Sequence, residues 1–147
     1  MKKIICLVVV ILMIAAVAYA AKKVPITAKN VASLKGTWTG SLSFATIGAA
    51  GGVPSPVTLE ILNDTVPVQA RLTINQVPDI IASQLGITGG KHIGESSDGK
   101  LTTQGTIMFV GAQPKNFFEV TLVGEKKISI WYYFNGLRGD AVFNKKK

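Results

Sequence analysis

The sequence predicts an all-β fold: an eight-stranded antiparallel up-and-down β-barrel with one short helix, preceded by an N-terminal signal peptide. Three observations lead to this prediction. Apolar and polar residues alternate with a period of two over most of the chain after residue 35. Short turns rich in Gly, Asn and Asp separate these runs. The runs also follow one another closely enough to form a meander, which closes readily into a barrel of eight strands. A two-sheet sandwich is the alternative architecture.

The first 20 residues have the pattern of a secretory signal peptide. Two lysines come first, residues 4–17 are an uninterrupted apolar run, and Ala18-Tyr19-Ala20 places small residues at a cleavage site. The apolar run is shorter than the roughly 20 residues that a spanning helix needs. We therefore expect cleavage after Ala20, export to the periplasm or the extracellular space, and a processed protein that does not span a membrane. Cys6, the only cysteine, lies in this segment, so the processed chain forms no disulfide.

The basic character of the chain is concentrated at its ends. The net charge is +8, yet residues 36–144 hold seven of the 16 Lys and Arg residues and all eight Asp and Glu residues, a net charge of −1. We therefore divide the chain into a signal peptide (1–20), a basic N-terminal segment (21–35) and one barrel domain (36–147). Nucleic-acid binding is not expected, because it normally requires a basic patch on the folded domain itself.

The alternating runs define the strands one by one. The predicted strands occupy residues 36–44, 57–61, 68–74, 91–95, 101–110, 117–122, 128–134 and 137–144. In the first strand Trp38, Leu42 and Phe44 share one face, and Thr and Ser occupy the other. This polar outer face argues against an outer-membrane barrel, which needs an apolar band toward the lipid.

Turn signals separate these strands. Turns are predicted at residues 63–65, 98–100 and 124–126, and at Asn135-Gly136, a pair that suits both central positions of a type I′ hairpin turn.

Residues 78–85 break the strand pattern and predict a short helix. Pro78 suits the first helical position, Asp79 suits the positive end of the helix dipole, and Gly86 suits the residue after the last turn. Ile81 and Leu85 would share one face of this helix. Two interpretations remain open: a plug that covers one end of the barrel, and a lid over a ligand cavity.

The sequence offers no convincing catalytic or metal site. His92 is the only histidine, which excludes a zinc site with two histidines from one chain, and no Gly-x-Ser-x-Gly elbow is present. The stretch Gly89-Gly90-Lys91 is not a phosphate-binding loop, because Leu85 and His92 stand where that motif needs Gly and Ser or Thr. We predict a non-enzymatic protein without metal or cofactor, with His92 on the surface at a glycine-rich turn.

Apolar side chains predicted to face the interior or the helix are the candidate ligand-binding residues. They are Phe44, Leu59, Leu72, Ile81, Leu85, Phe109, Phe118 and Tyr132. Ligand sites are concave and mainly apolar. The first functional hypothesis is therefore an exported barrel that binds a hydrophobic small molecule or lipid in its interior.

A second hypothesis follows from the aromatic residues that cannot face inward. Trp131 and Tyr133 lie on the opposite face of their strand from Tyr132 and Phe134, so one aromatic pair faces outward. Exposed apolar patches often mark partner sites. The alternative function is a protein-binding module, such as an inhibitor of a periplasmic or secreted enzyme or an envelope-assembly factor. It would use the face of Trp131 and Tyr133, or the loops 45–56 and 77–95.

The first strand resembles the signature of a known family. Gly36-x-Trp38, after a short segment at 31–35 that suits a 3₁₀ turn, is similar to the motif of lipocalins, members of the calycin superfamily of eight-stranded barrels. The resemblance implies that Trp38 packs at the closed end of the barrel and that a basic residue near the last strand covers its ring. Arg138 is the expected cover, and Gly36, Trp38 and Arg138 are then structural. Gly40 stands where avidins have an asparagine after the Trp, so biotin binding is not implied.

Overall fold

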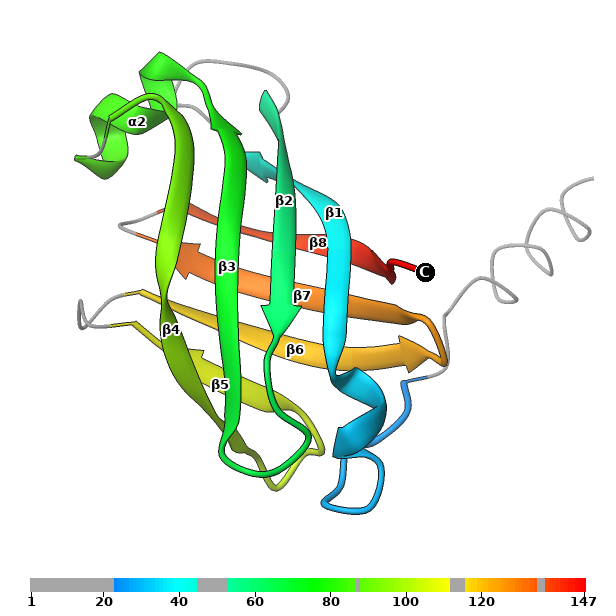
Figure 1. Cartoon of the computed structure of the whole chain (residues 1–147). Coiled ribbons are helices and arrows are strands. Elements are labelled where there is room, and N and C mark those ends of the chain that lie inside the picture. The colour runs from blue at the N-terminus through cyan, green and yellow to red at the C-terminus, as the bar shows by residue number, and fades with distance from the viewer. Residues whose placement is uncertain (1–22, 45–52, 87, 112–115, 135–136) are drawn as a thin grey trace, which may run out of the picture.

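The chain forms a closed antiparallel barrel in which neighbours in sequence are neighbours in space (Figure 1). The computed structural model describes residues 23–44, 53–86, 88–111, 116–134 and 137–147. The elements are η1 (Val31–Leu34, a 3₁₀ helix), β1 (Gly36–Phe44), β2 (Val53–Ile61), β3 (Val68–Val77), α2 (Asp79–Leu85), β4 (Gly90–Leu101), β5 (Ile107–Val110), β6 (Phe117–Gly124), β7 (Lys127–Phe134) and β8 (Leu137–Lys145). The predicted fold class is confirmed, including the eighth strand. The predicted signal peptide and the Asn135-Gly136 turn lie outside the described residues.

The short helix also forms where the sequence predicts it. It begins directly after Pro78, which has an extended backbone, and ends at Gly86, whose φ of 67° is left-handed. Glycine reaches this conformation without a steric penalty, and the Gly86 N–H then bonds to carbonyl groups of the last turn. Ile81 and Ala82 are buried against the barrel core.

The turn predicted at residues 98–100 is wrong. Strand β4 continues through these residues to Leu101, and the chain reverses only at 102–106, where the Thr102 N–H bonds to the Thr106 carbonyl group. Gly99 is inside the strand for a packing reason: a Cβ at this position would lie 2.5 Å from Cγ2 of Ile107 and from Cε1 of Phe109. The Asp-Gly-Lys triplet therefore makes room for a ring in the interior and does not make a turn.

The barrel consists of two four-stranded sheets that are joined mainly at one end. Strands β1–β4 form the front sheet, and β5–β8 run across behind them as the back sheet (Figure 1). Within the sheets the pairing ranges from four residues, between β5 and β6, to nine, between β1 and β2. The two seams between the sheets are short, because β1 pairs with β8 over three residues and β4 with β5 over three.

Both seams lie at the end of the barrel that η1 covers, which we call the closed end. The first pairs Trp38–Gly40 with Phe143–Lys145, and the second flanks the turn at 102–106. The N-terminal segment crosses this end: the Val24 N–H bonds to Leu122, and the Ile26 N–H bonds to Gly105. The opposite end, which carries α2, is called the helix end.

Trp38 is the centre of the closed end, as the lipocalin resemblance implies. Its side chain is fully buried, and its indole N–H donates a hydrogen bond of 2.7 Å to the carbonyl group of Leu34 in η1. Val31 and Leu34 are also buried in the core, and so is Ile26. The segment that composition set apart as a basic terminus therefore contributes three core side chains.

The residue that covers Trp38 is Lys145, and the prediction of Arg138 is wrong. The Lys145 ammonium group lies 5.4 Å from the Trp38 ring centroid and donates a hydrogen bond of 2.6 Å to the carbonyl group of Ser33. The register explains the choice, because Lys145 is paired with Trp38 across the seam, whereas Arg138 is paired with Tyr133 near the other end of β8. Gly36, with φ of 127°, leaves room for the Lys145 side chain.

Candidate functional site

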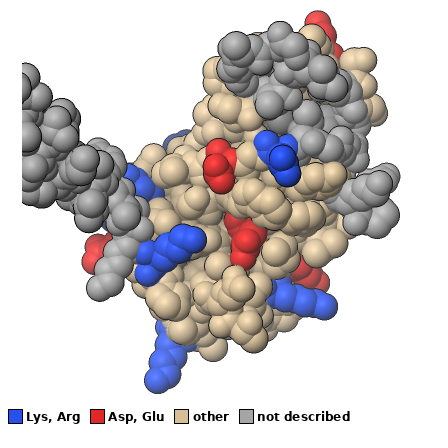
Figure 2. Space-filling model, turned by 180° about the vertical axis from the view of Figure 1, so that it is seen from behind, with Lys and Arg blue, Asp and Glu red and all other residues tan. Residues whose placement is uncertain are grey.

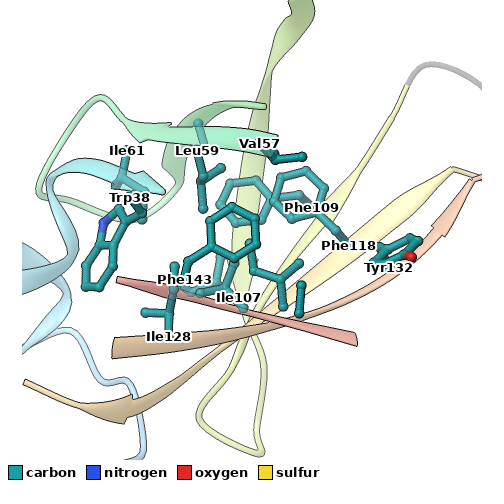
Figure 3. Packing of buried hydrophobic residues seen from close by; sticks show 14 of the residues in the cluster. Trp38, Val57, Leu59, Ile61, Ile107, Phe109, Phe118, Ile128, Tyr132 and Phe143 are labelled. Atoms are coloured by element: carbon teal, nitrogen blue, oxygen red, sulfur yellow. The ribbon is translucent and has the colours of Figure 1, made fainter. Parts of the chain in front are cut away.

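The closed half of the interior is filled by side chains. Five large residues in this half have no accessible surface, so they face neither solvent nor a void wide enough for a water molecule (Figure 3). They are Trp38, Leu59, Ile107, Ile128 and Phe143. A Cβ at Gly40 would lie 2.7 Å from the Phe143 ring, so this glycine allows close packing there. Phe109, Tyr132 and Ser55 toward the helix end are equally inaccessible, so a ligand could enter either half only by displacing side chains or moving the sheets apart.

A row of aromatic residues lies across the inner face of the back sheet. Phe109, Phe118 and Tyr132 are neighbours in register on β5, β6 and β7 (Figure 3). The rings of Phe109 and Phe118 are stacked with centroids 4.5 Å apart, and Tyr132 is stacked on Phe134 at 5.5 Å. Such contacts add about 1 kcal/mol each beyond the area they bury. We call Phe109, Phe118 and Tyr132 the aromatic row.

Tyr132 connects this row to the front sheet. Its hydroxyl group donates a hydrogen bond of 2.6 Å to the carbonyl group of Ser43 on β1, beyond the three residues where β1 and β8 pair. Gly139, its partner on β8, makes this reach feasible, because a Cβ there would lie 2.7 Å from the Tyr132 hydroxyl oxygen. A side chain thus replaces the missing backbone pairing at this seam.

The electrostatics of Tyr132 favour its neutral form. Burial raises the pKa of its hydroxyl group, and the charge of Asp140 raises it further. Because the pKa is higher in the folded than in the unfolded protein, the corresponding stabilisation is complete below about pH 10 and is lost as the pH rises through the folded-state pKa. The bond to Ser43 is therefore intact at neutral pH.

The helix half is less tightly joined. The pairing of β2 with β3 covers Val57–Ile61 and stops there, while β2 continues to Val53 along β1 alone. Pro54 and Pro56 lack the N–H that a ladder needs, which suits a segment that pairs on one side only. The Asn75 side chain donates a hydrogen bond of 3.1 Å to the Thr58 hydroxyl group near the point where the two strands separate.

Ser55 lies between these two prolines and faces inward. It shares a strand face with buried Val57 and Leu59, and its partner in register is Leu42, which is also buried. Ser55 has no accessible surface, and its hydroxyl oxygen has no hydrogen-bond partner. Such a group costs roughly 1–3 kcal/mol, so it calls for an explanation.

The predicted ligand-binding residues divide into several groups. Leu59 lies in the filled closed half, whereas Phe109, Phe118 and Tyr132 are brought together as the aromatic row. Ile81 is buried under α2, and Leu72 is partly buried against the core. The side chains of Phe44 and Leu85 lie outside what the structure describes. Contact of these residues with a ligand stays a prediction.

The sequence analysis did not identify Ser55, and it placed His92 both in a strand at 91–95 and on a surface turn. Ser55 continues the inward alternation of Val57 and Leu59, which is the signal that could have identified it. His92 lies in β4 opposite buried Ile74 and is partly exposed, so it is a strand residue near the helix end. The expected surface turn at this histidine is wrong.

The outward aromatic residues form an exposed cluster on the back sheet, which we call the outer aromatic cluster. Phe117 packs against Trp131 and Tyr133, with ring centroids 5.2 and 5.6 Å apart. Trp131 is 40% exposed, and Val110, the partner of Phe117 in register, is 61% exposed. From behind, charged side chains on this face are few and separated by uncharged surface (Figure 2).

Comparisons with protein-family models, curated proteins and solved structures give no match to this chain. In the part of the chain that the structure describes, no three His, Cys, Asp or Glu side chains are grouped so that they could hold a metal ion. No helix within the described ranges is both long and apolar enough to cross a membrane.

The close approach of Gly139 and Tyr132 gives a testable prediction. Gly139→Ala should lower the free energy of unfolding by about 2 kcal/mol, because the new methyl group overlaps the Tyr132 hydroxyl group. In a Tyr132→Phe background the same substitution should cost clearly less, since the overlapping oxygen is gone. Urea unfolding of the four proteins measures this coupling. Equal costs in the two backgrounds would show that Tyr132 does not lie over Gly139.

Proposed function

We propose that the protein is an exported, non-enzymatic β-barrel that binds a hydrophobic small molecule or lipid between its two sheets at the helix end. One observation carries this proposal: among the residues that the structure describes, the sheets share backbone pairing only at the closed end. The helix half can therefore widen without breaking the ladders that hold the barrel together. The aromatic row would form the floor of the site, and α2 would cover it.

The lining of the helix half suits such a ligand. Phe134, next to the aromatic row, is partly buried, as is Leu72 on β3, so apolar surface is available without unfolding the core. Ile81 and Ala82 are the described side chains of α2 that are buried in the core. A seven-residue helix is too short to be stable by itself, so α2 depends on these tertiary contacts and can detach as a unit. This favours the interpretation of α2 as a lid over that of a fixed plug.

The resemblance to lipocalins supports the same function. The chain has the eight-stranded barrel and a buried Trp38 at the closed end under a basic residue. Eight-stranded barrels of the lipocalin type are wide enough to hold one small ligand, and in this chain the helix end is the end opposite Trp38. The motif and the fold are the support for membership in this family, and folds of this kind carry several functions.

A spin-labelled long-chain alcohol, which is neutral, tests the proposal. Saturable binding to the ¹⁵N-labelled processed protein should broaden the amide signals of residues 74–82 and 132–134, because the label lies under α2. Amide signals of 36–40 at the closed end should remain sharp and serve as the internal control. No saturable binding, or broadening at the closed end, would contradict the proposal.

The outer aromatic cluster favours a second function, a protein-binding module that inhibits an enzyme or assists envelope assembly. Trp and Tyr are the residues that most often dominate protein interfaces, and here both pack on Phe117, with Trp131 exposed and Tyr133 partly exposed. Arg138 and Asp140 on β8 are exposed partners of Tyr133 and Trp131 in register and would form a polar rim.

Substitution of the cluster tests this second function. Partners captured from an envelope extract by the wild type should be lost with Trp131→Ala combined with Tyr133→Ala, because the aromatic anchor is gone. Leu62→Ala, which removes a 41% exposed apolar side chain from the turn after β2 on the front sheet, is the control and should retain them. Unchanged capture by the double variant would exclude this face as the binding surface.

A further inference from the structure

We infer that Ser55 is the hydrogen-bonding anchor of the ligand site, and that the ligand is a neutral amphiphile: an apolar chain that carries a hydroxyl or carbonyl group. This inference rests on the proposed function and names the class of ligand.

The first step is the chemistry of an unpaired hydroxyl group. A serine hydroxyl can donate one hydrogen bond and accept two, and the hydroxyl of Ser55 does neither although the residue has no accessible surface. The other two buried polar side chains of the described residues are Thr73 and Thr106, and Thr106 is bonded to Thr102 and Glu119. Alanine at position 55 would fill nearly the same volume without the cost of an unpaired hydroxyl group. The unpaired hydroxyl group therefore destabilises the ligand-free protein.

The second step is the position of Ser55 in the barrel. It lies on the part of β2 that pairs with β1 alone, where the front sheet begins to separate. Its partner Leu42 is next to Ser43, whose carbonyl group receives the Tyr132 hydroxyl group. Ser55 is therefore near the end of the aromatic row that reaches the front sheet. An apolar chain lying on that row would bring its terminal group toward this hydroxyl.

The third step is the absence of buried charge. The buried polar residues of the described chain are Ser55, Thr73 and Thr106, none of them ionisable at neutral pH. A carboxylate or phosphate in this interior would lose its hydration without gaining a counter-charge, which costs several kcal/mol. A neutral hydroxyl or carbonyl group needs only one partner, and Ser55 supplies it. Apart from His92, which is partly exposed on β4 opposite Ile74, this interior favours a neutral headgroup over an ionised one.

Matched ligands and matched variants test the inference. The protein is expressed as the full chain and purified in its processed form, as wild type, Ser55→Ala and the control Ser96→Ala, which removes an exposed hydroxyl from β4. The dissociation constants of octan-1-ol, the near-isosteric nonane and ionised octanoate are measured by displacement of a fluorescent apolar probe. The melting temperature of each ligand-free variant is recorded as well.

Ser55→Ala should weaken octan-1-ol binding about tenfold, the value of one lost hydrogen bond, and leave nonane binding unchanged. Ser96→Ala should change neither. Octanoate should bind the wild type more weakly than octan-1-ol. Ligand-free Ser55→Ala should melt a few degrees above the wild type, because an unpaired hydroxyl group has been removed.

The other possible results distinguish a failure of the Ser55 anchor, of the neutral ligand class and of the proposed function. If both octan-1-ol and nonane bind but Ser55→Ala affects them equally or not at all, the anchor is wrong while the proposed function stands. If octanoate binds best, the neutral class is wrong. A lower melting temperature for Ser55→Ala would show that the hydroxyl group is already paired in the free protein, which overturns the inference. If none of the three ligands binds, the proposed function fails together with it.

Discussion

The structure depends on how its two sheets are joined. Within the described ranges, backbone pairing connects them only at the closed end, over three residues at each seam. There the indole N–H of Trp38 bonds to η1, and Lys145 lies over the Trp38 ring and bonds to the same turn. These interactions, together with the fully buried side chains around them, keep the barrel closed at that end. The described residues of the helix end form no comparable connection, and this difference is the basis of the proposed ligand site.

Toward the helix end, a side-chain hydrogen bond connects the two sheets, whereas backbone pairing connects them at the closed end. The hydrogen bond from Tyr132 to Ser43 holds the back sheet to β1 beyond the last residue pair of the seam, and Gly139 leaves the space for it. A single bond of this kind is worth about 1 kcal/mol, far less than a run of ladder bonds inside a core. Ser55, close to this bond, has an unpaired hydroxyl group that a ligand can pair. Stability is thus concentrated at one end, and the unsatisfied polar group lies toward the other.

The sequence predicted the elements that depend on local patterns. It did not predict the roles of residues that are set by contacts with distant parts of the chain. Alternation predicted the strands, and Pro78 with Gly86 predicted the helix, because these signals act within a few residues. Gly99 looked like a turn residue, since the ring of Phe109 that requires it lies on another strand. Lys145 could not be told from its two lysine neighbours until the register placed it beside Trp38. Ser55 looked like an ordinary strand residue because lack of a partner is a property of the folded interior.

Amide hydrogen exchange of the ligand-free protein tests the central claim most directly. If the sheets are joined at one end only, amides of 38–40 and 143–145 exchange solely through global unfolding, whereas amides of 75–77 and of α2 exchange through local opening at a much lower free energy. The account predicts this gradient along the barrel. Equal protection at the two ends, or stronger protection at the helix end, would contradict it.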